Sequence, residues 1–346
     1  MRAETENRMN GIWYGEDPSP LWLRGLVPAY RVGQKLDRWW QLRHQPKDLT
    51  DACIVVVGNL SVGGSGKTPL VVRLCRLLRE AGLQAGVISR GYGRSEKRLR
   101  LVSAGSDPGE VGDEPLLIAQ QAGVPVIVSP DRCAAARALF KKGVQVVISD
   151  DGLQHYRLPR KIEICVIDGH RGFGNGQLLP AGPLREPTQR LHNVDHVVIN
   201  GDLRVPLPEL ETAGLQPAQM TLAAGLLRPL EGGQNWRLSQ FGGCRVNAVA
   251  GIGNPQRFFE LLRGARITVT EHIFPDHHLF SRDDFARMDP DLPILMTEKD
   301  AVKCRKLGLV NAWFLSVDAV LPAEWEAGLL QELNGLLKSK GSRPRR

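Results

Sequence analysis

The segment from Gly58 to Thr68, GNLSVGGSGKT, contains the residues best suited to bind a phosphate chain. It lies between an apolar run, Ile54–Val57, and a stretch with helical spacing, Pro69–Glu80. A glycine-rich turn between a strand and a helix directs backbone N–H groups and the positive end of the helix dipole toward one anion. The alternative is a turn that merely precedes Lys-Thr. We predict a nucleotide-binding loop formed by Ser61, Val62, Gly63, Gly64, Ser65, Gly66, Lys67 and Thr68.

Lys67 and Thr68 have separate tasks in such a loop. The Lys67 ammonium reaches the β- and γ-phosphates, and the Thr68 hydroxyl ligates Mg²⁺. The usual pattern, G-x-x-x-x-G-K-[ST], fits at Gly66-Lys67-Thr68 but has Ser61 at its first glycine. Gly63 and Gly64 can supply the backbone freedom that this glycine would give.

A pair of acids, Asp150 and Asp151, follows the apolar run Gln145–Ser149 and precedes Gly152. By itself this sequence is typical of a turn. A phosphate-binding loop, however, needs a carboxylate at the end of a neighbouring strand to hold the metal. We therefore predict that Asp150 and Asp151 are the metal-side carboxylates, with Thr68 as the third oxygen ligand.

Phosphoryl transfer to an alcohol also needs a group that accepts the hydroxyl proton. Asp113 and Glu114 of GDEP lie at the start of a predicted helix, where an acid is often only a cap. His277 and His278 of FPDHH lie in a polar loop, which a core position explains less well. These four residues remain candidates. A zinc site is the weaker alternative for the histidines, because no second His/Cys cluster has ligand spacing.

Three arginines are candidates for binding an anionic substrate group. Arg90 and Arg94 bracket flexible glycines in SRGYGR, at the end of a predicted strand where α/β sheets place ligands. Arg185 lies in LLPAGPLREP, which has too many prolines for a helix or strand and predicts a rigid loop. A solvated turn is the alternative for the first pair.

The elements that position these residues alternate between short strands and helices. Apolar runs predict strands at 54–57, 85–89, 124–128, 145–149 and 164–167, and helical spacing predicts helices at 69–80, 113–121 and 132–141. The alternation indicates an α/β fold with a mostly parallel sheet flanked by helices. Residues 201–235 interrupt the rhythm, and a second, smaller α/β lobe follows, with strands at 245–250, 267–270, 294–297 and 312–316 and a helix at 257–263. We predict three units, residues 1–45, 46–230 and 231–346.

The segment Ser19–Arg43 combines Trp, Leu and Tyr residues with almost exclusively basic charges. Such a segment can lie in a membrane interface, and an amphipathic helix packed on its own domain is the alternative. Pro28 predicts two short helices rather than one. No run of 18 apolar residues exists, so no membrane-spanning helix is expected.

The net charge of +8 favours an anionic partner such as a phospholipid surface or a phosphorylated substrate. Nucleic acid ranks lower, because aromatic residues are few and no RNA-binding signature occurs. The six cysteines are scattered without a CxxC pair, which favours buried, reduced thiols.

Taken in order, the motifs GNLSVGGSGKTP, ISRGYGR, GDEP, SDDGLQHYRL, LLPAGPLREP, GIGNPQRFF, FPDHH and TEKDAVK resemble the tetraacyldisaccharide 4′-kinase family of Gram-negative bacteria. The resemblance covers about residues 20–305. The order of the motifs is far more specific than the glycine-rich loop alone. Ser61 in place of a glycine also fits the family's form of the loop.

The resemblance implies a P-loop kinase-like fold and ATP- and Mg²⁺-dependent phosphorylation of the 4′-hydroxyl of a tetraacyldisaccharide 1-phosphate, which gives lipid IV A. It implies a peripheral or monotopic protein at the cytoplasmic face of the inner membrane, held there by residues 19–43. An acylated disaccharide phosphate would be its substrate, with no nucleic acid and no obligate protein partner. Asp113 and a histidine of FPDHH match the family's catalytic dyad, and His277 is preferred over His278.

Three other functions are compatible with the loop alone. A kinase for a different sugar or nucleotide would not need the Trp-rich N-terminal segment. A GTPase switch would normally need Asn-Lys-x-Asp, and Thr297-Glu-Lys-Asp300 is only the nearest approach. A nucleotide-binding scaffold would leave Asp113 and the two histidines without a task.

Overall fold

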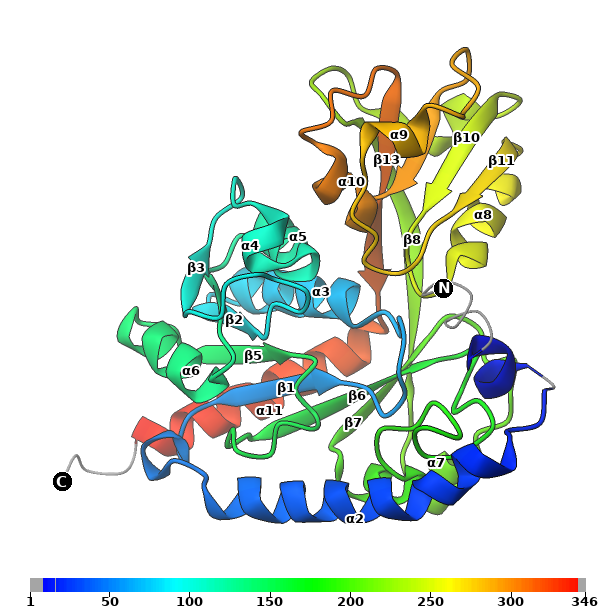
Figure 1. The fold of residues 1–346 in the computed structure, drawn as a ribbon. Helices are drawn as coiled ribbons and strands as arrows, with labels where there is room; N and C mark the ends of the chain where they lie inside the picture. The colour runs from blue at the N-terminus through cyan, green and yellow to red at the C-terminus, as the bar shows by residue number, and fades with distance from the viewer. Residues whose placement is uncertain (1–8, 16, 342–346) are drawn as a thin grey trace.

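The computed structural model describes residues 9–15 and 17–341 of the chain. The described strands form one long sheet in the order β11-β10-β12-β13-β8-β7-β6-β1-β5-β2-β4-β3, with β9 paired to β8. Figure 1 shows two regions along this sheet. We call them the large part, around β1–β7, and the small part, around β9–β12.

The large part contains the strands that end at the predicted site. Their bounds are β1 (Ile54–Gly58), β2 (Ala85–Ser89), β3 (Arg100–Val102), β4 (Val126–Val128), β5 (Val146–Asp150), β6 (Ile162–Asp168) and β7 (His196–Asn200). Every residue of β1, β2, β5 and β6 is buried, because helices or loops cover both faces of a parallel sheet. Only the edge strand β3 is antiparallel to its neighbour here.

Helices cover the two faces of this sheet. They are α3 (Lys67–Glu80), α4 (Pro108–Val111), α5 (Asp113–Ala122), α6 (Arg132–Lys141), α7 (Pro208–Thr212) and α11 (Ala323–Gly341), with the 3-10 turns η1 (Lys47–Leu49) and η2 (Thr188–Asn193). The apolar sides of α3, α5 and α11 share one core with the odd residues of β1, and α6 and α7 share the other core with its even residues. The sheet is thus the middle of three layers.

The small part repeats this arrangement on a lesser scale. It contains β9 (Trp236–Arg237), η3 (Leu238–Phe241), β10 (Arg245–Ala250), α8 (Pro255–Gly264), β11 (Thr268–Ile273), α9 (Arg282–Phe285), β12 (Ile294–Thr297) and α10 (Glu298–Cys304). Phe258 and Phe259 of α8 pack on one face, and α9 and α10 pack on the other. The parallel pairs β10–β11, β10–β12 and β12–β13 confirm the second α/β lobe.

Two long strands connect the parts. β8 (Ala218–Pro229) is parallel to β7 at its start and antiparallel to β13 (Ala312–Val320) along the rest. Figure 1 shows both strands running from the large part into the small one. Residues 201–235, which interrupt the predicted alternation, contain the long strand β8 at 218–229, which was not predicted. Ala218, Met220 and Leu227 are buried, but most other residues of β8 are exposed or half-buried, so no clear strand pattern stands out in the sequence.

A single helix, α2 (Leu21–Arg43), runs along the outside of the large part (Figure 1). The prediction of two helices was wrong, because Pro28 lies inside a continuous helix. Proline removes the N–H that would bond the carbonyl of Arg24. Arg24 and Pro28 are both exposed, so water can satisfy that carbonyl and the helix continues.

The remaining predicted elements are confirmed with small changes at their ends. Strands at 85–89, 245–250 and 294–297 and the helix at 132–141 have the predicted bounds. Five of the six cysteines are buried and Cys244 is exposed, and the cysteines form no disulfide in the described part of the chain. No helix in the described part of the chain is long and apolar enough to cross a membrane.

Candidate active site

The glycine-rich loop connects the end of β1 to the first residue of α3, as its pattern predicts. Gly66 has φ of +89°, a left-handed conformation in which any other residue would be strained. The Asn200 side chain at the end of β7 donates a hydrogen bond to the Ser65 carbonyl, 3.1 Å away, and leaves no space for a side chain at Gly66. Asn200, at the end of β7, therefore holds the turn in place.

The first half of the loop is bound to the 178–187 loop. The Val62 N–H donates to the Pro183 carbonyl at 2.8 Å, and the Val62 carbonyl accepts from the Tyr14 hydroxyl at 2.6 Å. Ser61 forms an isolated bridge with Leu184. Both polar backbone atoms of Val62 are thus engaged within the protein.

Lys67 lies between an amide and a carboxylate. Its Nζ donates to Asn59 Oδ1 at 3.1 Å and is 3.4 Å from Asp151 Oδ1. Asn59 is fully buried, directly after β1. These contacts hold the ammonium over the loop, where it can reach a phosphate.

Asp150 and Asp151 end β5, next to β1, but their environments differ. Asp150 is buried and accepts one hydrogen bond, from Ser89 Oγ at 3.3 Å. Burial, together with the charges of Glu114 and Asp151, raises the pKa of Asp150 to about 7. Burial also opposes ionisation of Asp151, but Lys67, Arg185 and Arg132 outweigh it and hold the pKa of Asp151 well below its usual range. Lys67 and Arg132 also act on Asp150, but among the described residues no cation forms an ion pair with it.

Of the three predicted arginines, only Arg185 contacts another site residue. Its Nη1 donates to both carboxylate oxygens of Asp151 at 3.1 Å. Arg90 follows the last residue of β2 and is exposed. Arg94 donates to the Arg98 carbonyl at 2.8 Å, within its own loop.

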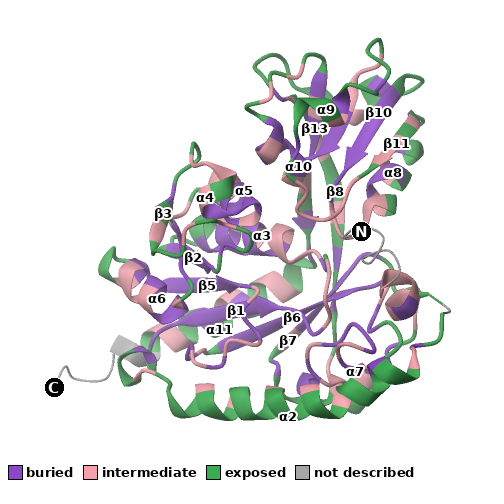
Figure 2. Ribbon diagram, in the orientation of Figure 1, coloured by how far each residue is buried: buried purple, intermediate pink, exposed green. Residues whose placement is uncertain are grey.

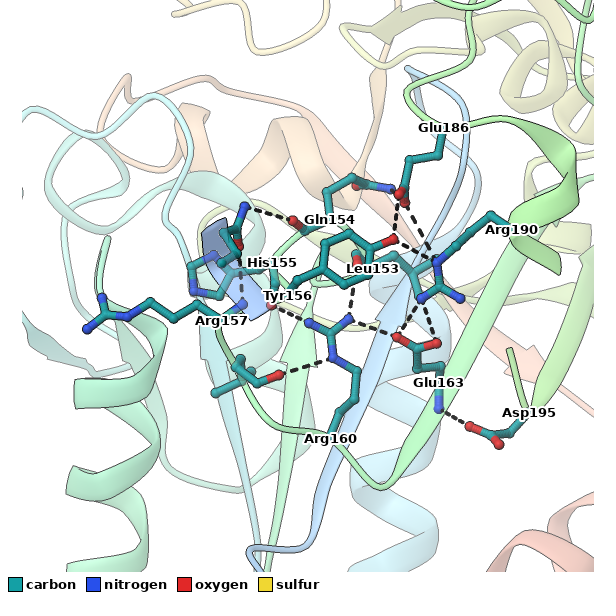
Figure 3. A network of polar contacts seen from close by, with 12 residues as sticks. Leu153, Gln154, His155, Tyr156, Arg157, Arg160, Glu163, Glu186, Arg190 and Asp195 are labelled. Carbon is teal, nitrogen blue, oxygen red and sulfur yellow. Dashed lines mark hydrogen bonds and ion pairs between the residues drawn. The ribbon is translucent and has the colours of Figure 1, made fainter. Parts of the chain in front are cut away.

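A buried polar network supports the loop that carries Arg185 (Figure 3). Glu186 is 1% exposed and accepts hydrogen bonds from the Tyr156 hydroxyl and from Gln154 Nε2. Arg190 donates to the Tyr156 hydroxyl at 2.8 Å and binds both oxygens of Glu163 at 2.6 Å. Buried charges are tolerated only when they are paired in this way. The network therefore fixes the position of Arg185 beside Asp151.

Asp113 and His277 form a hydrogen-bonded pair, although 164 residues separate them in the chain. Asp113 is the first residue of α5 and is 7% exposed, and His277 lies in the loop after β11. His277 Nδ1 is 3.0 Å from Asp113 Oδ2 and 3.2 Å from Oδ1. Burial opposes ionisation of Asp113, yet the hydrogen bond from His277 and the charge of Lys299 lower its pKa to about 2.

The same contact also shifts the pKa of His277. Burial would lower its pKa, but the hydrogen bond and charge of Asp113 raise it above the usual value. The exposed ring of Tyr92, in the loop after β2, lies 5.2 Å from the imidazole. His277 has φ of +61°, a left-handed backbone conformation.

His278 occupies a different environment. Its Nε2 is 3.2 Å from Asp284 Oδ2, and its ring stacks on Phe274 at 4.9 Å. The structure therefore brings His277, and not His278, to Asp113.

Residues of the small part also contact the large part near the glycine-rich loop. Gly253 of GIGNP approaches Gly64 so closely that a Cβ at position 253 would be 2.8 Å from the Gly64 nitrogen. Lys299 Nζ lies 3.0 Å from Glu114 Oε1 and 3.0 Å from Asp276 Oδ1. Asp300 accepts from the Gly251 N–H at 2.8 Å and so fixes the GIGNP turn.

Several of these residues were not predicted from the sequence. Asn59, Arg132, Gln154 and Asn200 carry no pattern that distinguishes them. Lys299 lies in the TEKD motif, which was used above only for the family resemblance and to argue against a GTPase.

Comparison with known proteins agrees with this geometry. The family model described as tetraacyldisaccharide-1-P 4′-kinase, LpxK, matches residues 21–334. The tetraacyldisaccharide 4′-kinase of Xanthomonas euvesicatoria is 46% identical over 345 residues, covering 96% of this chain and 98% of the relative. That of Alkalilimnicola ehrlichii is 52% identical over 267 residues, covering 77% and 78% of the two chains.

The solved structures include a close match in fold. The crystal structure titled as the "apo" form of LpxK from Aquifex aeolicus in complex with ATP superposes with a TM-score of 0.69 and 28% identity, covering 91% of this chain and 99% of that one. The family model covers most of this chain, and the relative from Xanthomonas euvesicatoria is 46% identical over nearly its full length. The chain belongs to the tetraacyldisaccharide-1-P 4′-kinase family.

Proposed function

We propose that the protein transfers the γ-phosphate of ATP to the 4′-hydroxyl of a tetraacyldisaccharide 1-phosphate and so forms lipid IV A in lipid A biosynthesis. Membership of the family supports this assignment. The observation that carries it is the Asp113–His277 pair, which joins a helix of the large part to a loop of the small part at 3.0 Å. A nucleotide-binding scaffold would have no use for such a pair.

The pair accepts the proton of the attacking hydroxyl. With a pKa of about 2, Asp113 is ionised at neutral pH and accepts the hydrogen bond from His277 Nδ1. The Nε2 lone pair of neutral His277 is then the proton acceptor, and the Asp113 charge stabilises the imidazolium that forms. Because the pKa of His277 is raised, the active form is present above that pKa and is lost as the pH falls.

The residues at the end of β5 and the start of α3 fit a magnesium ion. Hard oxygen donors such as the Asp150 carboxylate and the Thr68 hydroxyl are those that Mg²⁺ prefers. The raised pKa of Asp150 reflects a buried carboxylate for which Lys67 and Arg132 only partly compensate burial and the neighbouring acids. We assign Asp150 and Thr68 as ligands, and Asp151 to holding Lys67 and Arg185. Mg²⁺ would neutralise charge on the β- and γ-phosphates, and Lys67 and the second half of the loop would bind them.

The lipid substrate and the membrane meet the protein along α2. Its outward side carries large exposed apolar residues, of which Leu21 is 82%, Trp22 69% and Leu36 61% exposed. Arg24, Arg31 and Lys35 are exposed among them. Apolar side chains with interspersed cations suit the headgroup region of an anionic membrane. We infer a peripheral protein at the cytoplasmic face of the inner membrane.

We further propose a division of labour among the three predicted units. Residues 1–45 attach the protein to the membrane, 46–230 bind nucleotide and metal, and 231–346 supply His277 to the site. β8 ends at Pro229, just before the second boundary, and it pairs with β7 on one side and with β13 on the other, so the two larger units share a sheet.

Labelled γ-phosphate tests the proposal directly. Purified protein, Mg²⁺ and γ-labelled ATP are incubated with detergent-solubilised tetraacyldisaccharide 1-phosphate or with the unacylated disaccharide 1-phosphate. We expect label on the acylated acceptor and little on the unacylated one. Equal labelling of both would indicate a sugar kinase that does not use α2, and transfer to neither by protein that binds ATP would reject the kinase assignment.

A further inference from the structure

A single lysine, Lys299, contacts both carboxylates that flank the Asp113–His277 pair. Lys299 is the second residue of α10, and α10 packs against α5. Its Nζ is 3.0 Å from Glu114, which directly follows Asp113 on α5. It is also 3.0 Å from Asp276, which directly precedes His277 in the loop after β11. The lysine therefore holds the neighbours of both members of the pair.

Asp276 transmits this contact to His277. Asp276 Oδ1 accepts the backbone N–H of His277 at 3.0 Å, and Oδ2 is 3.9 Å from His277 Nε2. His277 has the left-handed φ of +61°, an unusual conformation for a side-chain-bearing residue. A turn of this kind persists when surrounding contacts determine it. The Lys299–Asp276 ion pair supplies one of those contacts.

The lysine also balances an acidic cluster. The charged groups that face the pair are Asp113 and Glu114 on α5, Asp276 in the loop after β11, and Lys299 and Lys303 on α10. Lys303 is committed to Asp300, 2.8 Å away. The side chain of Lys299 is 16% exposed, so its charge acts on the cluster with little screening by water.

We propose that Lys299 is a positioning residue, which aligns Asp113 with His277 across the two parts and balances the carboxylate charge around them. The inference rests on the proposed function and goes beyond it. Without Lys299, three carboxylates would surround one imidazole. Glu114 and Asp276 would lose the cation that binds the large part to the small part beside the dyad.

The charge of Lys299 affects the pH at which the Asp113–His277 pair takes up a proton. It lowers the pKa of both Asp113 and His277. Removing it therefore raises the affinity of the pair for a proton, whichever member holds the proton. The acid limb of the kcat profile should then move to higher pH, because the basic form is lost earlier as the pH falls.

The test compares Lys299→Met with Lys306→Met. Lys306 is a matched control, since it bridges the small part to Asp107 of the large part but has a 76% exposed side chain. We expect Lys299→Met to shift the acid limb upward by about one pH unit. We also expect kcat at pH 7 to fall on the order of tenfold to a hundredfold, with little change in ATP binding. Lys306→Met should keep the wild-type profile.

Two further variants keep the inference testable if Lys299→Met does not fold. Lys299→Arg preserves the charge and should keep the acid limb near its wild-type position, even if the longer side chain slows turnover. Asp276→Asn removes one negative charge and should move the limb to lower pH. In the double variant Lys299→Met/Asp276→Asn, the limb should return toward that of the wild type.

The inference would be overturned if the acid limb of folded Lys299→Met did not shift, or if Asp276→Asn did not move the limb to lower pH. The proposed function would remain intact in either case, as long as the wild-type protein transfers phosphate to the lipid. Loss of transfer in the wild-type protein itself would instead reject the proposed function. The readout thus separates the two failures.

Discussion

The pairing of Asp113 with His277 makes these two residues one functional unit. His277→Ala leaves Asp113 without its hydrogen-bond partner, and Asp113→Ala leaves the imidazole without its anion. Each change should lower kcat on the order of a hundredfold to ten-thousandfold, while ATP affinity stays within about twofold. The double variant should lose little beyond the worse single variant, because the second change removes a group whose partner is already gone.

Steady-state kinetics and ATP titration of the three variants check this expectation. His278→Ala is the matched control, because His278 contacts Asp284 and Phe274 instead of Asp113. Losses that multiply in the double variant would show that Asp113 and His277 act independently.

At this scale the sequence identified the residue types but not all their partners. Lys67, Asp150, Asp151 and Asp113 follow local patterns at strand or helix ends, so their neighbourhood could be predicted. The choice between His277 and His278 depends on which side chain the folded loop brings to Asp113, and the two adjacent letters do not encode this. Lys299 was missed because its partners, Glu114 and Asp276, are distant in sequence.

Helix α2 turns a stripe of apolar and polar residues inward and its largest apolar residues outward. Leu23 is buried, and Val27, Tyr30, Gln34 and Gln41 are half-buried at helical spacing. Figure 2 shows that most of the rest of α2 is exposed. Tyr30 donates to the Arg185 carbonyl at 3.0 Å, and Gln34 donates to Glu186 at 3.2 Å. Hydrogen bonds, rather than apolar packing alone, attach the helix. The apolar outward side is consequently available to a membrane.

The triple change Trp22→Ser/Leu36→Ser/Trp39→Ser should weaken binding to vesicles containing anionic phospholipid on the order of tenfold or more, because three large apolar side chains no longer enter the interface. ATP binding should persist, since these residues point away from the loop. Vesicle co-sedimentation and ATP titration measure the two effects. Val310→Ser is the control, as Val310 is 88% exposed in the small part. Unchanged sedimentation of the triple variant would reject α2 as the membrane contact.

Elements with a clear period were predictable, and elements defined by distant pairing were not. The buried strands β2, β10 and β12 have apolar runs that match their bounds. β8 has no buried side over most of its length, and it forms because β13, about ninety residues later, pairs with it. A proline usually ends or kinks a helix, so Pro28 predicted a break. The helix continues because the turn around Pro28 is exposed and water can satisfy the carbonyl that lost its hydrogen bond.

The whole molecule assembles one site from two parts. The large part supplies Lys67, Thr68 and the carboxylates after β5, and the small part supplies His277, Lys299 and the GIGNP turn against Gly64. Composition and charge indicated an α/β protein with an anionic partner, but only the fold brings these segments together. The order of motifs in the sequence was sufficient to identify the family. The geometry of the site required the structure.

The most direct test of the central claim is the position of the transferred phosphate. Phosphorus and proton NMR of the lipid produced from ATP and tetraacyldisaccharide 1-phosphate would reveal it, with Lys67→Met as the inactive control. We predict one new phosphomonoester whose phosphorus correlates with the 4′ proton of the disaccharide, formed by the wild-type protein only. A phosphate at another hydroxyl, or free phosphate from ATP without any lipid product, would contradict the account.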